Sequence, residues 1–195
     1  MKKLLVSLCV LNLMTMAVRA DVLIGRMETG DGREPSYTLG VCTNEGPEFW
    51  AFAVPNFPIL EFGYTHYFPL GKRSGVLAGG YVSRWCEVNQ WYAEPIAIGF
   101  TRLGDWKVKA FFGAYAPLNG GPWQLYSNPT QITTAVTPNV DLGVAGTCWF
   151  TQGAKPTFGF GPTGSLKVGD LTFSARALVG INQQNSVRFE VTCPF

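Results

Sequence analysis

The side chains that could carry out acid–base or nucleophilic catalysis are few in this 195-residue sequence. The single histidine, His66, stands in the stretch Tyr64-Thr65-His66-Tyr67. A histidine base needs a nucleophile and an orienting acid within reach, and the alternation of an extended strand puts Glu61 on the face opposite His66. We therefore assign no catalytic residue and expect His66 to lie among aromatic side chains near a strand end.

Thiols are the next candidates for chemistry. Cys9 lies in the N-terminal segment discussed below, and the remaining four are Cys42, Cys86, Cys148 and Cys193. An even number of cysteines in an exported chain permits two disulfides, in three connectivities that the sequence does not rank. No Cys-x-x-Cys pair occurs and there is one histidine, so we expect neither a zinc site nor a cofactor.

Charged side chains recur on one face of alternating segments. In the C-terminal stretch SVRFEVTCPF, the odd-numbered residues from Val187 to Phe195 are apolar, whereas Arg188, Glu190 and Thr192 share the other face. In a soluble sandwich such a polar face meets water, and in an outer-membrane barrel it faces the lumen. The expected lumen network consists of Glu61, Lys107, Lys109, Arg176, Arg188 and Glu190.

The N-terminus has the pattern of a secretory signal peptide. Lys2 and Lys3 precede a mostly apolar run, which ends at Val18-Arg19-Ala20 before Asp21. The run contains polar residues and is shorter than the roughly 20 apolar residues of a transmembrane helix. Without residues 1–20, 12 basic and 13 acidic residues remain, a net charge of −1. No basic stripe is left to suggest a nucleic-acid partner.

The composition of the remaining chain favours an all-β membrane protein. Charged residues make up 14% of the sequence, compared with roughly 25% in soluble domains. Alternating segments interrupted by Gly, Pro, Asn and Asp indicate β-hairpins. The clearest are 58–69, where Leu60, Phe62 and Tyr64 share a face, and 95–102, where Ile96, Ile98 and Phe100 do so. We read these apolar faces as lipid-facing.

The sequence predicts one antiparallel up-and-down transmembrane β-barrel over residues 21–195, with about ten strands and a range of eight to twelve. Eight segments have clear strand patterns: 58–67, 74–85, 91–102, 106–116, 141–151, 157–166, 171–180 and 186–195. Segments 47–54 and 130–137 complete the favoured ten, whereas 22–28 and 36–43 are left out. Tight turns near Gly71, Gly104 and Gly169 are expected at the periplasmic end, and Pro117–Pro129 is expected as an outward loop.

Aromatic residues near the expected strand ends suggest a girdle at the two membrane interfaces. The residues in this group are Trp85, Trp91, Tyr92, Trp106, Phe150 and Phe195.

The final strand resembles the C-terminal strand of small Gram-negative outer-membrane β-barrel proteins. In those proteins alternate apolar residues lead to a terminal Phe that the insertion machinery recognises, and Val187, Phe189, Val191 and Phe195 match this pattern. The resemblance implies outer-membrane lipid and that machinery as partners. Residues 58–116 and 156–195 are also similar in layout to the lipid A palmitoyltransferase class. However, the chain contains no Asp-Ser pair and no His-x-Ser-Asn motif, so the catalytic residues of those enzymes are absent.

Three function classes remain open at this point. The favoured one is a small integral outer-membrane barrel with a structural, surface-interaction or narrow-pore role. One alternative is a barrel enzyme that modifies envelope lipid, and another is a soluble exported β-sandwich that binds a ligand. The oligomeric state is not specified by the sequence.

Export can be tested directly. We expect N-terminal sequencing of the mature protein to begin at Asp21, and the protein to fractionate with the outer membrane. Recovery of correctly cleaved protein mainly in the soluble periplasmic fraction would contradict the barrel and favour the sandwich.

Overall fold

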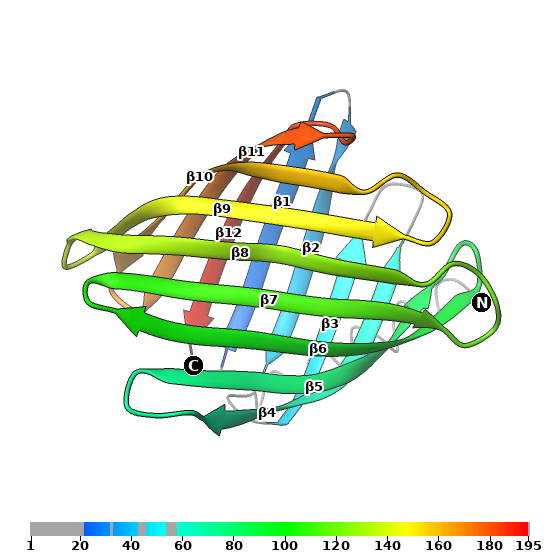
Figure 1. The fold of residues 1–195 in the computed structure, drawn as a ribbon, viewed down its shortest axis with the longest axis horizontal. Coiled ribbons are helices and arrows are strands. Elements are labelled where there is room, and N and C mark those ends of the chain that lie inside the picture. The colour runs from blue at the N-terminus through cyan, green and yellow to red at the C-terminus, as the bar shows by residue number, and fades with distance from the viewer. Residues whose placement is uncertain (1–21, 32, 43–45, 54–57, 195) are drawn as a thin grey trace.

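The computed structural model describes residues 22–31, 33–42, 46–53 and 58–194 (Figure 1). Over these residues the chain forms twelve antiparallel strands in a closed barrel, in which each strand pairs with its neighbours in sequence and β12 pairs with β1. The strands are β1 (Val22–Gly30), β2 (Arg33–Cys42), β3 (Gly46–Ala53), β4 (Ile59–Pro69), β5 (Ser74–Trp85), β6 (Gln90–Leu103), β7 (Trp106–Pro117), β8 (Gln124–Thr137), β9 (Val140–Thr151), β10 (Thr157–Val168), β11 (Leu171–Ile181) and β12 (Ser186–Pro194). The signal segment and Phe195 lie outside the described residues.

Alternation along each strand separates an outer face from a lumen face. On β4, Phe62 and Tyr64 are more than half exposed, whereas Glu61 and Thr65, which flank them at alternate positions, are buried. On β11 and β12 the outward side chains include Phe173, Val179 and Phe189. The arrangement is that of a membrane barrel, with apolar side chains outside and polar side chains inside. Within the described residues no helix is long and apolar enough to cross a membrane.

The strand number lies at the upper limit of the predicted range. The favoured count of ten left out segments 22–28 and 36–43; residues 22–28 belong to β1 and residues 36–42 belong to β2. Twelve strands fit because several connections contain only two residues, such as those at 104–105, 138–139 and 169–170. Gly104 and Gly169 have φ angles of 63° and 60°, which glycine adopts readily in such tight turns.

The two ends of the barrel differ in their connections. Val22 and Pro194 are paired, so both ends of the described barrel lie together, and up-and-down order puts the turns at Gly71, Gly104 and Gly169 at that same end. The expected loop Pro117–Pro129 is shorter than predicted, since β8 already begins at Gln124. A register shift between Ser127 and Thr130 accommodates Pro129 within β8, and proline is tolerated at such bulges.

One strand face was assigned to the wrong side by the sequence pattern. Ile98 pairs with Phe111 and Phe100 pairs with Lys109, whose Nζ lies 5.9 Å from the Phe100 ring centroid. These side chains, with the buried Ile96, face the lumen. In the middle of β6 the outward face carries Ala97, Gly99 and Thr101, so small residues meet lipid there, whereas Trp91 and Leu103 are exposed near the two ends of the strand.

The lipid-facing assignment of β12 can be tested with neighbouring substitutions. Val191→Arg places a cation in hydrocarbon, at a cost of about 2 to 4 kcal/mol near the bilayer midplane and less near an interface. Thr192→Arg is the matched control, since Thr192 pairs with Ile24 and Thr172 on the lumen face. We expect urea titration of vesicle-inserted protein to show the larger loss of stability for Val191→Arg; equal losses would contradict the assignment.

Candidate functional site in the barrel lumen

The lumen contains a group of charged side chains where the last strands meet the first. Arg26 of β1 faces Glu190 of β12, and its Nε donates to Glu190 Oε2 at 2.9 Å. One step along, Arg188 Nε donates to Glu28 Oε2 at 2.7 Å. Arg176 of β11 pairs in register with Arg188, and its Nη2 lies 3.9 Å from Glu190 Oε2. Strand pairing thus brings residues more than 140 positions apart into one site.

Positive charge exceeds negative charge in this group. Lys109 of β7 interacts electrostatically with Glu190, Arg26 and Arg176. We call Arg26, Lys109, Arg176 and Arg188, with Glu28 and Glu190, the cation cluster; it has four cationic and two anionic side chains. The Arg176 and Arg188 side chains are only 9% and 7% exposed. Arg188 Nη1 is buried without a hydrogen-bond partner. An anion in the lumen would supply the missing acceptor.

The predicted lumen residues do not form one network. Lys107 lies on the same strand face as Lys109 but pairs with Asp141 of β9, at 2.6 Å from Oδ2. Glu61 lies in a separate group with Glu94, where Tyr115 Oη donates to Glu61 Oε1 at 2.8 Å and Ser83 Oγ donates to Glu94 Oε2 at 2.8 Å.

The sequence pattern did not predict several of the residues that line the lumen. Arg26 and Glu28 lie in a segment excluded from the favoured strands. Glu94 shares a face with Ile96, which had been assigned to lipid.

An aromatic core fills part of the lumen beside the two carboxylates. We call its six members the lumen aromatic cluster: Trp85, Tyr92, Phe111, Tyr115, Tyr126 and Trp149. The rings of Tyr126 and Trp149 are stacked at a centroid separation of 4.6 Å, and those of Tyr115 and Tyr126 at 5.2 Å. Tyr126 Oη also donates to Glu94 Oε1. The barrel therefore has an aromatic packing layer inside its polar lumen.

This cluster corrects part of the predicted interfacial girdle. Trp85 and Tyr92 pack inside the barrel, with centroids 4.8 Å apart. Trp91, Trp106 and Phe150 are exposed large side chains, as residues of a girdle would be.

Glycines of neighbouring strands make room for lumen aromatic rings. A Cβ added at Gly113 would lie 2.5 Å from Tyr126 Cζ, and one added at Gly63 would lie 2.3 Å from Tyr81 Cδ1. A Cβ added at Gly40 would lie 2.3 Å from Cε3 of the Trp50 ring. Glycine at these positions lets each ring lie close against the wall of the barrel.

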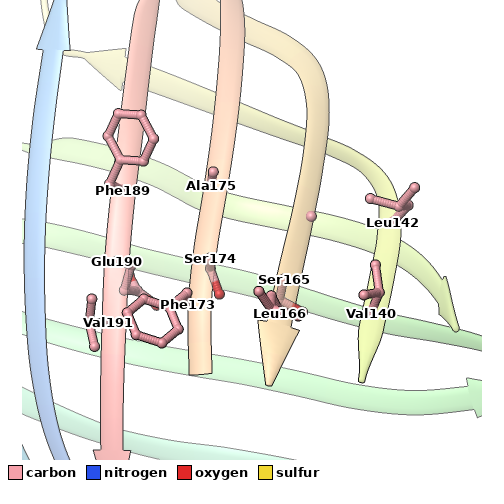
Figure 2. A pocket seen from close by; sticks show the side chains of 11 residues that line it. Val140, Leu142, Ser165, Leu166, Phe173, Ser174, Ala175, Phe189, Glu190 and Val191 are labelled. Atoms are coloured by element: carbon pink, nitrogen blue, oxygen red, sulfur yellow. The ribbon is translucent and has the colours of Figure 1, made fainter. Parts of the chain in front are cut away.

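A shallow cavity of about 370 Å³ lies on the outside of β9–β12 (Figure 2). Its wall includes Leu142, Leu166, Phe173 and Phe189, and Gly164 contributes no side chain. Most of its lining residues are apolar and belong to the outward faces of their strands. The cavity therefore belongs to the lipid-facing surface and is separate from the lumen site.

The remaining candidate residues occupy other places. His66 lies on the outward face of β4, and its ring is 4.8 Å from Phe68 in an edge-on arrangement. None of Cys42, Cys86, Cys148 and Cys193 forms a disulfide. In the described part of the chain no three His, Cys, Asp or Glu side chains gather as metal ligands. Of the expected assembly signal, Val187, Phe189 and Val191 share the outward face of β12.

Comparison with solved structures agrees with this architecture. A KdgM porin superposes with a TM-score of 0.68 over 89% of this chain and 99% of its own, at 13% identity. A NanC porin gives 0.62 over 89% and 100%, also at 13% identity. The fold is that of an outer-membrane β-barrel. The translocator domain of the autotransporter NalP from Neisseria meningitidis gives 0.52 over 89% and 87%, at 10% identity. No protein-family model matches the sequence, and neither does any curated protein.

The close fit of Tyr126 over Gly113 gives a stability prediction. We expect Gly113→Ala to destabilise the barrel by about 1 to 3 kcal/mol, because the added methyl displaces the tyrosine ring from its stack. Gly99→Ala is the control, since its Cβ would have Ala110 O at 3.9 Å as its nearest neighbour. Thermal unfolding in detergent measures both variants; equal midpoints would show that the ring shifts without cost.

Proposed function

We propose that the protein is a narrow outer-membrane pore that passes small anionic solutes. The observation that carries this proposal is the cation cluster, which on its own has two more cationic than anionic side chains and contains the unpartnered Arg188 Nη1. In a narrow, low-dielectric passage such an excess raises the local concentration of anions and opposes cations.

The geometry of the arginines suits carboxylate or phosphate groups. Glu190 and Glu28 hold Arg26 and Arg188 through hydrogen bonds, which fixes the direction of these guanidinium groups. Arg176 has a longer 3.9 Å contact to Glu190, so it retains donor capacity for a solute. Planar guanidinium groups bind carboxylate and phosphate oxygens in paired hydrogen bonds.

The structural neighbours support a pore and suggest a solute class to test. One KdgM porin, with a TM-score of 0.67 at 14% identity over 89% of this chain and 99% of its own, was solved in complex with disordered oligogalacturonate. Galacturonate is a sugar carboxylate, and the cation cluster offers the complementary charge. We therefore propose acidic saccharides as the first solutes to examine here.

The location follows from the same proposal. Export through the cleaved signal at residues 1–20 would deliver the chain to the insertion machinery, with the outward face of β12 as part of the assembly signal. Outer-membrane lipid would then contact the outward apolar side chains. No arrangement in the described part of the chain favours the envelope-lipid enzyme over a pore.

Charge selectivity can be measured in planar bilayers under a KCl gradient. We expect the wild-type protein to conduct with anion preference, and Arg176→Gln to lower the chloride-to-potassium permeability ratio by about two-fold or more. Arg176 is the suitable target because Glu190 keeps its bond to Arg26 when Arg176 changes.

The controls separate charge from shape and position. Arg176→Lys should preserve the reversal potential, and Lys155→Gln, in the connection between β9 and β10, should leave it unchanged. A folded wild-type protein without conductance would contradict the pore, and cation preference would contradict the role of the cluster.

A further inference from the structure

The lumen aromatic cluster, which packs beside Glu61 and Glu94, takes no part in the anion site proposed above. We propose that it forms a fixed wedge on the β4–β9 side of the lumen, so that the passage follows the wall of β10, β11, β12 and β1. Tyr115 and Tyr126 would then set the size limit of the pore. This inference rests on the proposed pore function.

Hydrogen bonds between non-adjacent strands show that the wedge extends into the lumen. Tyr115 of β7 donates to Glu61 of β4, three strands away in the barrel. Tyr126 of β8 donates to Glu94 of β6, two strands away. Side chains of a curved wall can meet across intervening strands only on its concave side. These two tyrosines therefore cross part of the barrel interior.

Packing and hydrogen bonding hold the wedge in place. The rings of Tyr115 and Tyr126 lie within 20° of parallel, and those of Tyr126 and Trp149 within 15°. Tyr92, Tyr115 and Tyr126 are 3–7% exposed. Ser83 donates to Glu94, so the carboxylate that accepts from Tyr126 is itself fixed.

The opposite wall carries mainly small and cationic residues, with the buried Leu178 of β11 between Gly180 and Arg176. Gly159, Gly161 and Thr163 of β10 continue the lumen face that pairs with Gly180 and Arg176 of β11. The arginines of the cation cluster lie on β1, β11 and β12. In Figure 1, β6–β8 form the near wall of the barrel, and β12 and β1 lie behind them. A solute that follows the β10–β1 side would meet the arginines while the wedge fills the facing side.

The wedge lies toward the end of the barrel that is away from the termini. Tyr92, Tyr115, Tyr126 and Trp149 are each the third residue from that end of their strands. Arg188 has the same place on β12. Under the expected membrane orientation this is the outer end, so the wedge would sort solutes by size as they enter.

The test combines single-channel conductance with the largest neutral polyethylene glycol that enters the pore. The double variant Tyr115→Ala/Tyr126→Ala removes both rings, and we expect at least about a two-fold rise in conductance and entry of larger polymers. Tyr115→Phe/Tyr126→Phe keeps the rings and should preserve the size limit. Tyr37→Ala, on the outward face of β2, is the control.

A second variant approaches the passage from the opposite side. Thr163→Trp enlarges a lumen residue on β10 and should lower conductance if solutes follow that wall. It also keeps the inference testable if the double alanine variant does not fold, which a heat-dependent gel shift and circular dichroism would reveal. Normal conductance of folded Thr163→Trp, or an unchanged size limit in the folded double alanine variant, would overturn the wedge.

The outcomes separate this inference from the proposed function. If the wild-type protein is silent but the double alanine variant conducts, the rings fill the lumen completely, and both the open pore and the passage beside the wedge are contradicted. If the double alanine variant admits larger polymers while the wild-type protein shows no anion preference, the wedge is supported and only the role of the cation cluster fails.

Discussion

Closure of the sheet is the constraint on which the rest of this structure depends. A backbone N–H or C=O without a partner costs several kcal/mol in hydrocarbon, so a membrane sheet must join its first strand to its last. Here β1 and β12 meet over nine residue pairs from Val22–Pro194 to Gly30–Ser186. The bonds Arg26–Glu190 and Arg188–Glu28 cross this same seam. The seam therefore satisfies the backbone and builds the charged site together.

The lumen is lined by polar side chains, and part of its space is filled by packed aromatic rings. A barrel of twelve strands leaves space that its wall side chains must fill or leave open. On one side the space is taken by Trp149 and by stacked tyrosines, whose hydroxyl groups donate to the neighbouring carboxylates Glu61 and Glu94. On the other side glycine and threonine of β10 keep the wall thin. The division between a packed half and a charged half follows from which strands supply the bulky residues.

The sequence predicted the class of fold and the faces of several strands from local alternation alone. Phe173, Val179 and Val191 face outward as their spacing indicated, and the short turns at Gly104 and Gly169 lie where glycine marks them. Alternation identifies two faces but not which is inside, and this is why the β6 stripe of Ile96 and Ile98 was placed in lipid. The segment 22–28 was left out of the favoured strands, and its pairing with β12 could not be read from local alternation because these two strands lie at opposite ends of the chain.

The members of the lumen site were harder to predict than the fold. Arg188 and Glu190 were recognisable as charged residues on one face of a strand whose other face is apolar. Their partners Glu28 and Arg26, however, come from the opposite end of the chain. Their pairing depends on strand register after closure, which no local pattern contains. The contact between Tyr115 and Glu61 depends in addition on curvature, since three strand positions separate them.

The small outward residues of β5 and β6 have a consequence for the surrounding bilayer. Ala78 and Gly80 of β5 are paired with Ala97 and Pro95 of β6, and these small residues face lipid as a strip between Tyr64 of β4 and Phe112 of β7. Around the barrel, Phe173, Phe189 and Leu142 make the β9–β12 surface rough and hollowed (Figure 2). Acyl chains can lie almost against the backbone on the first side but must bend around rings on the second. We expect lipid chains to be ordered differently on these two sides of the barrel.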